Sequence, residues 1–145
     1  MLSLAFNINL FATFPGLVNK ELPIFFGYPA FGVNAPFGEA TFGIFEVGGI
    51  RYSIGEENIV LLNSSLGFGG NIGKWELAFG FSGTTAGIPR LNIYDQSYTA
   101  IFLRGGYRLK FLKGGINLPI YLLAQEGKFS VLPAPMIYVS LSTQR

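Results

Sequence analysis

Residues 72–82 read Ile-Gly-Lys-Trp-Glu-Leu-Ala-Phe-Gly-Phe-Ser and alternate almost completely between large apolar residues and polar or small ones. The apolar positions are Trp75, Leu77, Phe79 and Phe81. Because the side chains of a β-strand point to opposite faces with a period of two residues, this segment is predicted to be a strand. One of its faces is rich in aromatic residues, and the other is polar or small. The same alternation recurs along the chain and decides the fold class.

The overall composition is too apolar for an ordinary water-facing surface. The chain has 145 residues, the size of one domain, and we expect residues 1–145 to form that domain. Hydrophobic residues make up 50% of the chain and charged residues only 12%, which is about half the usual charged share. Much of the surface is therefore expected to face either lipid or neighbouring protein subunits.

Several classes of function lack the residues that they need. The net charge is only +2 and the basic residues are scattered, which argues against nucleic acid as a partner. The chain contains no Cys and no His, so disulfides, Ser-His-Asp triads, Cys-His dyads and His-ligated metals are excluded. We expect no catalytic, cofactor-binding or metal-ligating residues, and hence a non-enzymatic protein.

Three local motifs are better explained by turns and ordinary strands than by chemistry. The glycine-rich residues 67–73 are not followed by a helical pattern, so no helix N-terminus is available to hold a phosphate. Glu56 and Glu57 are expected to be solvated in a turn, because a cation site needs several more oxygen ligands. Ser64 and Ser65 have no His to activate them.

Further strands are predicted at residues 2–10, 37–47, 50–54, 59–68, 98–104, 107–111, 116–124 and 136–142. The pairs Gly48-Gly49 and Gly105-Gly106 are predicted to be hairpin turns, since glycine accepts the positive φ that tight turns require. Further turns are predicted at residues 14–17, 56–58, 69–71, 113–115 and 125–128, and a loop at 83–89. Residues 17–36 are expected to be irregular, because three prolines there remove backbone donors.

Roughly eight to ten strands joined mostly by tight turns indicate an all-β antiparallel meander. A meander leaves two unpaired edges unless the sheet closes on itself. We therefore predict a single barrel of about eight strands with tight, Gly-rich hairpin turns.

The polar faces of the predicted strands carry small residues, such as Ser3, Ala5, Ala78 and Gly80, which suit a narrow lumen better than an open surface. This favours an inverted barrel with its charges inside and its apolar face outside. The expected lumen charge network takes in Glu46, Arg51, Lys74, Glu76, Arg108 and Lys110, with Glu39 as a further acid. The expected lipid- or partner-facing residues include Trp75, Leu77, Phe79, Phe81, Tyr107, Leu109 and Phe111. The alternative is that the charged residues are solvated on the surface.

Over most of its length the chain resembles small outer-membrane β-barrel proteins in this alternation, as a class and not as a specific family. The resemblance implies an outer-membrane location and membrane lipid as a partner. Two features depart from the pattern. Residues 140–145 read Ser-Leu-Ser-Thr-Gln-Arg, whereas such barrels often end on an aromatic residue, and residues 1–6 lack the basic start of a signal peptide. Either a signal peptide has been removed or the chain is not exported.

Three functions remain open at this point. The first is a small transmembrane β-barrel with a structural, adhesive or narrow-pore role. The second is a β-rich structural subunit of a homo-oligomeric assembly, such as a filament, sheath or capsid, whose neighbouring subunits cover the apolar face. The third is a soluble barrel that binds an apolar ligand in its interior.

Overall fold

The computed structural model describes residues 2–11, 26–54, 57–88, 93–125 and 128–143, and it is all-β in these ranges. No helix that could cross a membrane occurs in the part of the chain described. The strands are β1 (Ser3–Phe11), β2 (Phe26–Pro36), β3 (Thr41–Ile54), β4 (Glu57–Ile72), β5 (Trp75–Ile88), β6 (Ile93–Leu109), β7 (Leu112–Gln125), β8 (Lys128–Pro133) and β9 (Met136–Ser142).

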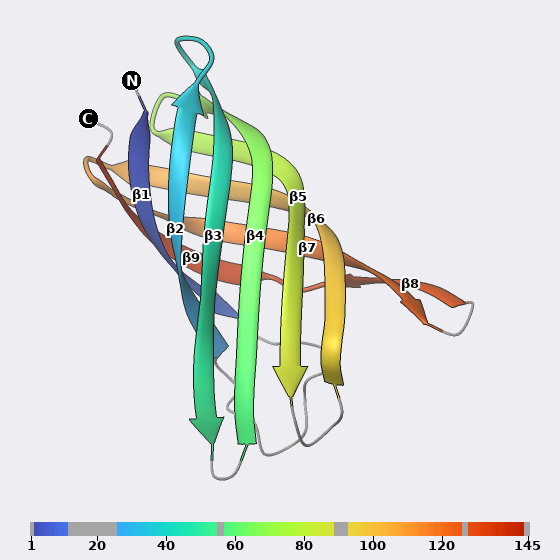
Figure 1. Ribbon diagram of the computed structural model, residues 1–145. Helices are drawn as coiled ribbons and strands as arrows, with labels where there is room; N and C mark the ends of the chain where they lie inside the picture. The colour runs from blue at the N-terminus through green and yellow to red at the C-terminus, as the bar shows by residue number, and fades with distance from the viewer. Residues whose placement is uncertain (1, 12–25, 55–56, 89–92, 126–127, 144–145) are drawn as a thin grey trace.

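The sheet closes into a barrel (Figure 1). Strands β1 to β7 pair with their neighbours in chain order, and β9 pairs with both β7 and β1, always antiparallel. Strands β8 and β9 together occupy the place of a single strand in the barrel wall, because both pair with β7 in one unbroken register. Ile120 lies opposite Pro133 on one side of the break and Asn117 opposite Met136 on the other. The predicted all-β barrel of eight strand positions is therefore confirmed.

Strand β1 begins and strand β9 ends at the same end of the barrel, called here the terminal end (Figure 1). Three short turns lie at the same end, formed by residues 37–40, Gly73-Lys74 and Lys110-Phe111. Gly73 and Lys110, the first residues of the two-residue turns, have φ values of 62° and 54°. A positive φ at this position lets a two-residue loop follow the right-handed twist of the flanking strands.

The lumen contains buried polar and charged side chains together with small and some large apolar ones, whereas the outward face consists mainly of large aliphatic and aromatic side chains. On β9, for example, Tyr138 and Ser140 are buried while Ile137 and Val139 are exposed. Three apolar clusters fill the spaces between the polar groups of the lumen. Their buried members are Phe42, Ile44, Ala78 and Phe102; Tyr28, Ala30, Leu61 and Met136; and Ala100, Tyr121 and Ala134.

The predicted diglycine hairpins are wrong. Gly48-Gly49 lies inside β3 and Gly105-Gly106 inside β6, while the turn predicted at 113–115 lies inside β7. The physical reason is close packing rather than turn geometry. A Cβ on Gly106 would lie 2.0 Å from the Tyr138 hydroxyl, and a Cβ on Gly115 would lie 2.0 Å from the Gly105 carbonyl oxygen. Only glycine allows these approaches.

Other boundaries also shift. Residues 69–71 belong to β4, whose turn lies at Gly73-Lys74, and β5 continues to Ile88 through most of the predicted loop at 83–89. The predicted irregular region contains β2, in which Pro29 pairs only with β1, because pairing with β3 begins at Ala30. Glu57 and Asn58 belong to β4, and Gln125 and Lys128 end β7 and begin β8. The rest of those two predicted turns, the turn at 14–17 and residues 17–25 lie outside the described residues.

Gly115→Ala is expected to lower the free energy of unfolding by about 1–3 kcal/mol, because the new methyl group collides with backbone rather than with a movable side chain. Gly114→Ala is the matched control on the same strand, since its Cβ would lie 3.7 Å from the Tyr138 carbonyl oxygen, an ordinary contact. Denaturant titration of both variants measures the difference. Equal stability of the two would contradict the close-packing explanation.

Candidate functional site

A buried ion pair joins opposite walls of the lumen. Glu46 projects inward from β3 and Arg104 from β6, and both side chains are almost fully buried. The Arg104 guanidinium donates to both carboxylate oxygens, from Nη1 to Oε2 at 3.0 Å and from Nη2 to Oε1 at 3.2 Å. Asn7 Nδ2 on β1 donates to the same Oε2. This two-pronged geometry is the strongest form of Arg–carboxylate pairing.

Two aromatic rings cover the guanidinium of this pair. The Arg104 Cζ atom lies 5.5 Å from the centroid of the Phe102 ring and 5.0 Å from that of Tyr138. A cation over an aromatic face gains further electrostatic stabilisation, especially where water is excluded. Arg104 therefore links three parts of the barrel wall, namely β3, β6 and β9.

A second charged cluster lies nearer the terminal end. Lys113 Nζ on β7 donates to both carboxylate oxygens of Glu76 on β5, at 2.7 and 2.8 Å. Arg108 Nη2 lies 3.6 Å from Glu76 Oε2 and donates to Asn71 Oδ1 at 3.0 Å. The Glu76 side chain is 1% exposed, whereas that of Arg108 is 27% exposed. Arg108 therefore connects the buried pair to the rim of the barrel.

A neutral polar group occupies a third part of the lumen. Asn63 Nδ2 donates to Thr84 Oγ1 at 2.7 Å, and Ser65 Oγ donates to Asn63 Oδ1 at 3.1 Å. The Tyr121 hydroxyl lies 3.4 Å from Thr84 Oγ1. The two charged clusters and this neutral group together connect strands β3 to β7 through polar contacts. Among the described residues, no set of three or more acidic side chains could hold a metal ion.

The lumen network has different members from those expected. Glu46 and Glu76 are buried in it and Arg108 reaches it, but Arg51, Lys74 and Lys110 are exposed. Lys74 and Lys110 would point inward by strand alternation, yet they sit in the two-residue turns beyond the last strand pairs, Ile72↔Trp75 and Leu109↔Leu112. Arg51 lies an odd number of residues from inward-facing Glu46 and so faces outward. Glu39 is also exposed.

The two main cationic partners, Arg104 and Lys113, are not among the expected lumen charges. Alternation could have found Arg104, because Phe102 and Arg104 share one face of β6 while Ile101 and Leu103 share the other. Lys113 falls in the turn predicted at 113–115, so alternation does not indicate its inward direction, although it lies in β7.

The seven residues expected to face lipid or a partner are all exposed, Tyr107 least at 37% and Phe81 most at 65%. The Trp75 and Tyr107 rings meet edge to face across β5 and β6, with centroids 5.0 Å apart. Exposed large hydrophobic side chains occur on every wall position, and together they are called here the apolar belt. Besides those seven residues it includes Leu4, Ile8, Leu10, Phe31, Phe45, Val47, Leu62, Leu66, Phe68, Ile101, Leu103, Leu112, Ile116, Val131, Ile137, Val139 and Leu141.

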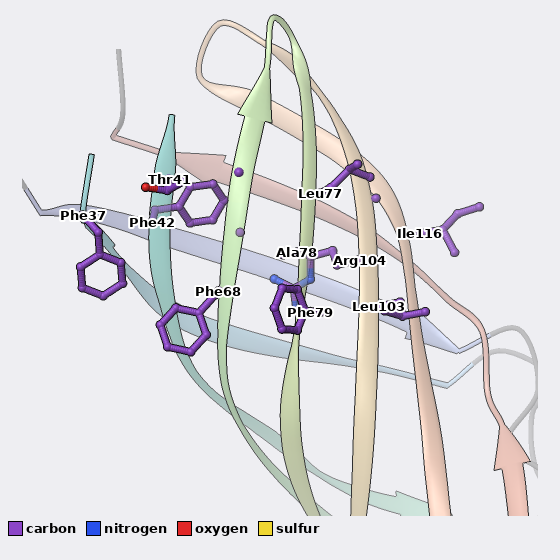
Figure 2. Close-up of a pocket in the computed structure, with 13 residues that line it drawn as sticks. Phe37, Thr41, Phe42, Phe68, Leu77, Ala78, Phe79, Leu103, Arg104 and Ile116 are labelled. Atoms are coloured by element: carbon purple, nitrogen blue, oxygen red, sulfur yellow. The ribbon is translucent and has the colours of Figure 1, made fainter. Parts of the chain in front are cut away.

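One part of the belt is hollowed into a groove of about 830 Å³ (Figure 2). Phe68, Phe79, Leu103 and Ile116 stand over the neighbouring strands β4 to β7 around it, and Leu77 lies within it. The groove lies on the terminal half of the barrel, close to the turn at Gly73-Lys74.

Arg104→Met is expected to destabilise the barrel by about 3–5 kcal/mol, because it leaves the buried Glu46 carboxylate without its counter-charge. Glu46→Leu should cost a similar amount. The double variant should cost much less than the sum, since it removes both buried charges together. Denaturant unfolding of all four proteins gives the coupling energy. Additive costs would show that the two side chains do not act as a pair.

No protein-family model and no curated protein sequence matches the chain. Among solved structures, the chain is similar to Ail, the attachment invasion locus protein of Yersinia pestis, at 11% identity and a TM-score of 0.47, covering 97% of this chain and 95% of that one. It is also similar to the outer membrane enzyme PagL, at 8% identity and a TM-score of 0.43, covering 97% of both chains. These likenesses are in strand pattern only, and no specific family is indicated.

Proposed function

We propose that the protein is a non-enzymatic β-barrel that spans an outer membrane and has a structural or adhesive role, with its lumen closed by the two charged clusters. The observation that carries this proposal is the inverted distribution of side chains. Glu46, Glu76, Arg104 and Lys113 are buried inside, while the apolar belt faces outward. In a transmembrane barrel the lipid-facing side chains are apolar and the interior is polar.

The continuity of the belt supports lipid rather than protein as its cover. Exposed large hydrophobic residues follow one another around the barrel, from Leu4 on β1 through Phe68 on β4 to Val139 on β9. A symmetric assembly buries one or two distinct patches of each subunit. A soluble barrel with an apolar ligand would instead direct its hydrophobic side chains into the lumen. Lipid surrounds a membrane barrel on all sides, and an apolar belt that runs around the whole barrel requires such a cover.

The lengths of the strands are sufficient to cross a bilayer. A membrane-spanning β-strand needs about 9–11 residues when it is tilted. Strands β3 to β7 have 14 to 17 residues each. In barrels of this class, short turns face the periplasm. We therefore place the terminal end, with its two-residue turns, on the periplasmic side.

The contents of the lumen favour a structural or adhesive role over a pore. The bidentate Glu46–Arg104 pair, the Tyr138 ring against it and the Glu76–Lys113 pair occupy the interior in succession. An eight-stranded barrel has an interior just wide enough for its own side chains. Passage of a solute would require these charged contacts to break, so a permanently open channel is disfavoured.

Folding into lipid vesicles tests the proposal. The purified chain should require detergent for solubility and should fold when diluted from urea into phosphatidylcholine vesicles. Its folded form should then migrate differently from the heated form on a gel. A large, homogeneous assembly in detergent-free buffer would instead support the structural-subunit hypothesis, and a soluble monomer would support the ligand-binding barrel.

Phe79→Arg and Phe111→Arg add depth information to this test. Phe79 lies within the belt, whereas Phe111 lies in the turn at the terminal end, and both are highly exposed. An arginine deep in the bilayer costs about 2–4 kcal/mol, but one near the interface costs only about 0–1 kcal/mol. Phe79→Arg should therefore lower the folding stability in vesicles far more than Phe111→Arg. Equal effects would count against insertion in this orientation.

A further inference from the structure

The groove in the apolar belt arises where two outward-facing glycines flank one leucine. Gly70 on β4 and Gly105 on β6 lie directly opposite Leu77, one on each side of β5. The next row of outward side chains, toward the middle of the barrel, is bulky and consists of Phe68, Phe79 and Leu103. The missing side chains at the two glycines therefore leave a depression beside a raised apolar wall (Figure 2).

The depression is not required by backbone packing. A Cβ on Gly70 would lie 3.6 Å from the Ala40 carbonyl oxygen, and a Cβ on Gly105 would lie 3.7 Å from Leu77 Cδ2. Both are ordinary contact distances, unlike those at Gly106 and Gly115. A β-carbon would therefore fit at both positions, and the outer surface is left hollow although backbone packing does not demand it.

Two cationic residues lie in the turns beyond this groove at the terminal end. Lys74 and Lys110 are both exposed, and no salt bridge to either is found among the described residues. A hydrogen bond of 2.9 Å from Arg108 N to Lys74 O holds the two turns together. The exposed acid at this end, Glu39, lies in the turn of residues 37–40, on the β3 side of the groove, where Phe37 and Thr41 line it. The positive part of the rim is therefore the part formed by the turns that follow β4 and β6.

The spacing matches the two parts of a phospholipid. Lys74 lies three residues before Leu77, about 10 Å along the strand. With a strand tilt of about 40°, this is about 7–8 Å along the membrane normal. The headgroup layer on each side of the hydrocarbon core is about 5–8 Å thick. Lys74 thus reaches the headgroup level when the groove lies at the edge of the hydrocarbon, and Lys110, five residues after Gly105, lies farther toward the water. The Trp75–Tyr107 pair lies between Leu77 and the two lysines, where aromatic girdles occur.

We propose that this face binds one anionic phospholipid, with an acyl chain in the groove over Gly70 and Gly105 and the phosphate between Lys74 and Lys110. The inference rests on the proposed membrane-spanning function and names a partner of that same surface. An anionic lipid is favoured over a zwitterionic one because the rim carries two exposed lysines, neither of which forms a salt bridge to another described residue. Each cation near a membrane surface strengthens the binding of an anionic lipid by about fivefold.

Native mass spectrometry of the detergent-solubilised barrel tests the proposal, with phosphatidylglycerol and phosphatidylethanolamine of matched chains as probes. Phosphatidylglycerol should remain bound to a greater extent, by about tenfold or more. Lys74→Gln combined with Lys110→Asn should remove this preference; Asn is used at position 110 because it tolerates the positive φ. Gly105→Leu should fill the groove and weaken retention of both lipids.

Matched controls separate these effects from general loss of lipid contact. Gly83→Leu adds the same side chain at Gly83, an exposed, outward-facing glycine of β5 that lies away from the groove. Arg51→Gln removes an exposed cation outside the terminal end. Both controls should retain phosphatidylglycerol as the unsubstituted protein does, and soluble glycerol phosphate should not compete, because it lacks the acyl chain.

Three results would overturn the inference: equal retention of the two lipids, an unchanged preference in the lysine variant, or unchanged retention in Gly105→Leu. Gel migration of the folded and heated forms is recorded for every variant. If the chain folds into vesicles but shows no lipid preference, only this inference fails. If it does not fold into vesicles at all, the proposed function fails as well.

Discussion

The closed sheet imposes one constraint on which the rest of the structure depends, namely that a charge inside a side-chain-filled lumen must be paired. Glu46 and Glu76 are each about 1% exposed, so neither carboxylate can rely on bulk water. Arg104 and Lys113 supply the counter-charges from strands on other parts of the wall. Because the partners come from different strands, the same contacts that satisfy the charges also fix which strands face one another across the lumen.

Glycine makes this filled interior sterically feasible. The Tyr138 ring stacks on Arg104, and its hydroxyl occupies the space that a side chain at Gly106 would take. On the neighbouring strand β7, Gly115 lies against the backbone of Gly105. Glycines in the wall thus have two distinct roles. Those facing inward make room for large lumen side chains, whereas Gly70 and Gly105 face outward and leave the groove in the apolar belt.

The alternation of residues was sufficient to predict the closed all-β barrel and the outward face, because a period of two assigns each side chain to one side of the wall. Trp75, Leu77 and Phe79 follow that rule without exception. The rule failed where a residue's position relative to the turn decided its direction. Lys74 and Lys110 have the alternation of lumen residues but lie in the turns, while Lys113 was assigned to a turn and lies in a strand. Diglycine pairs caused these errors, since close packing and tight turns both require glycine and only the three-dimensional contacts distinguish them.

The central claim is that the apolar belt faces lipid, and the single tryptophan of the chain, Trp75, tests it most directly. Trp75 is 59% exposed and lies at the terminal end of the belt. In vesicles, its fluorescence should be quenched more by lipids brominated near the glycerol end of the acyl chain than by lipids brominated near the methyl end. In a Trp75→Phe, Phe79→Trp variant, the balance should shift toward the deeper bromine. Absence of quenching by any brominated lipid, together with full folding, would contradict the account.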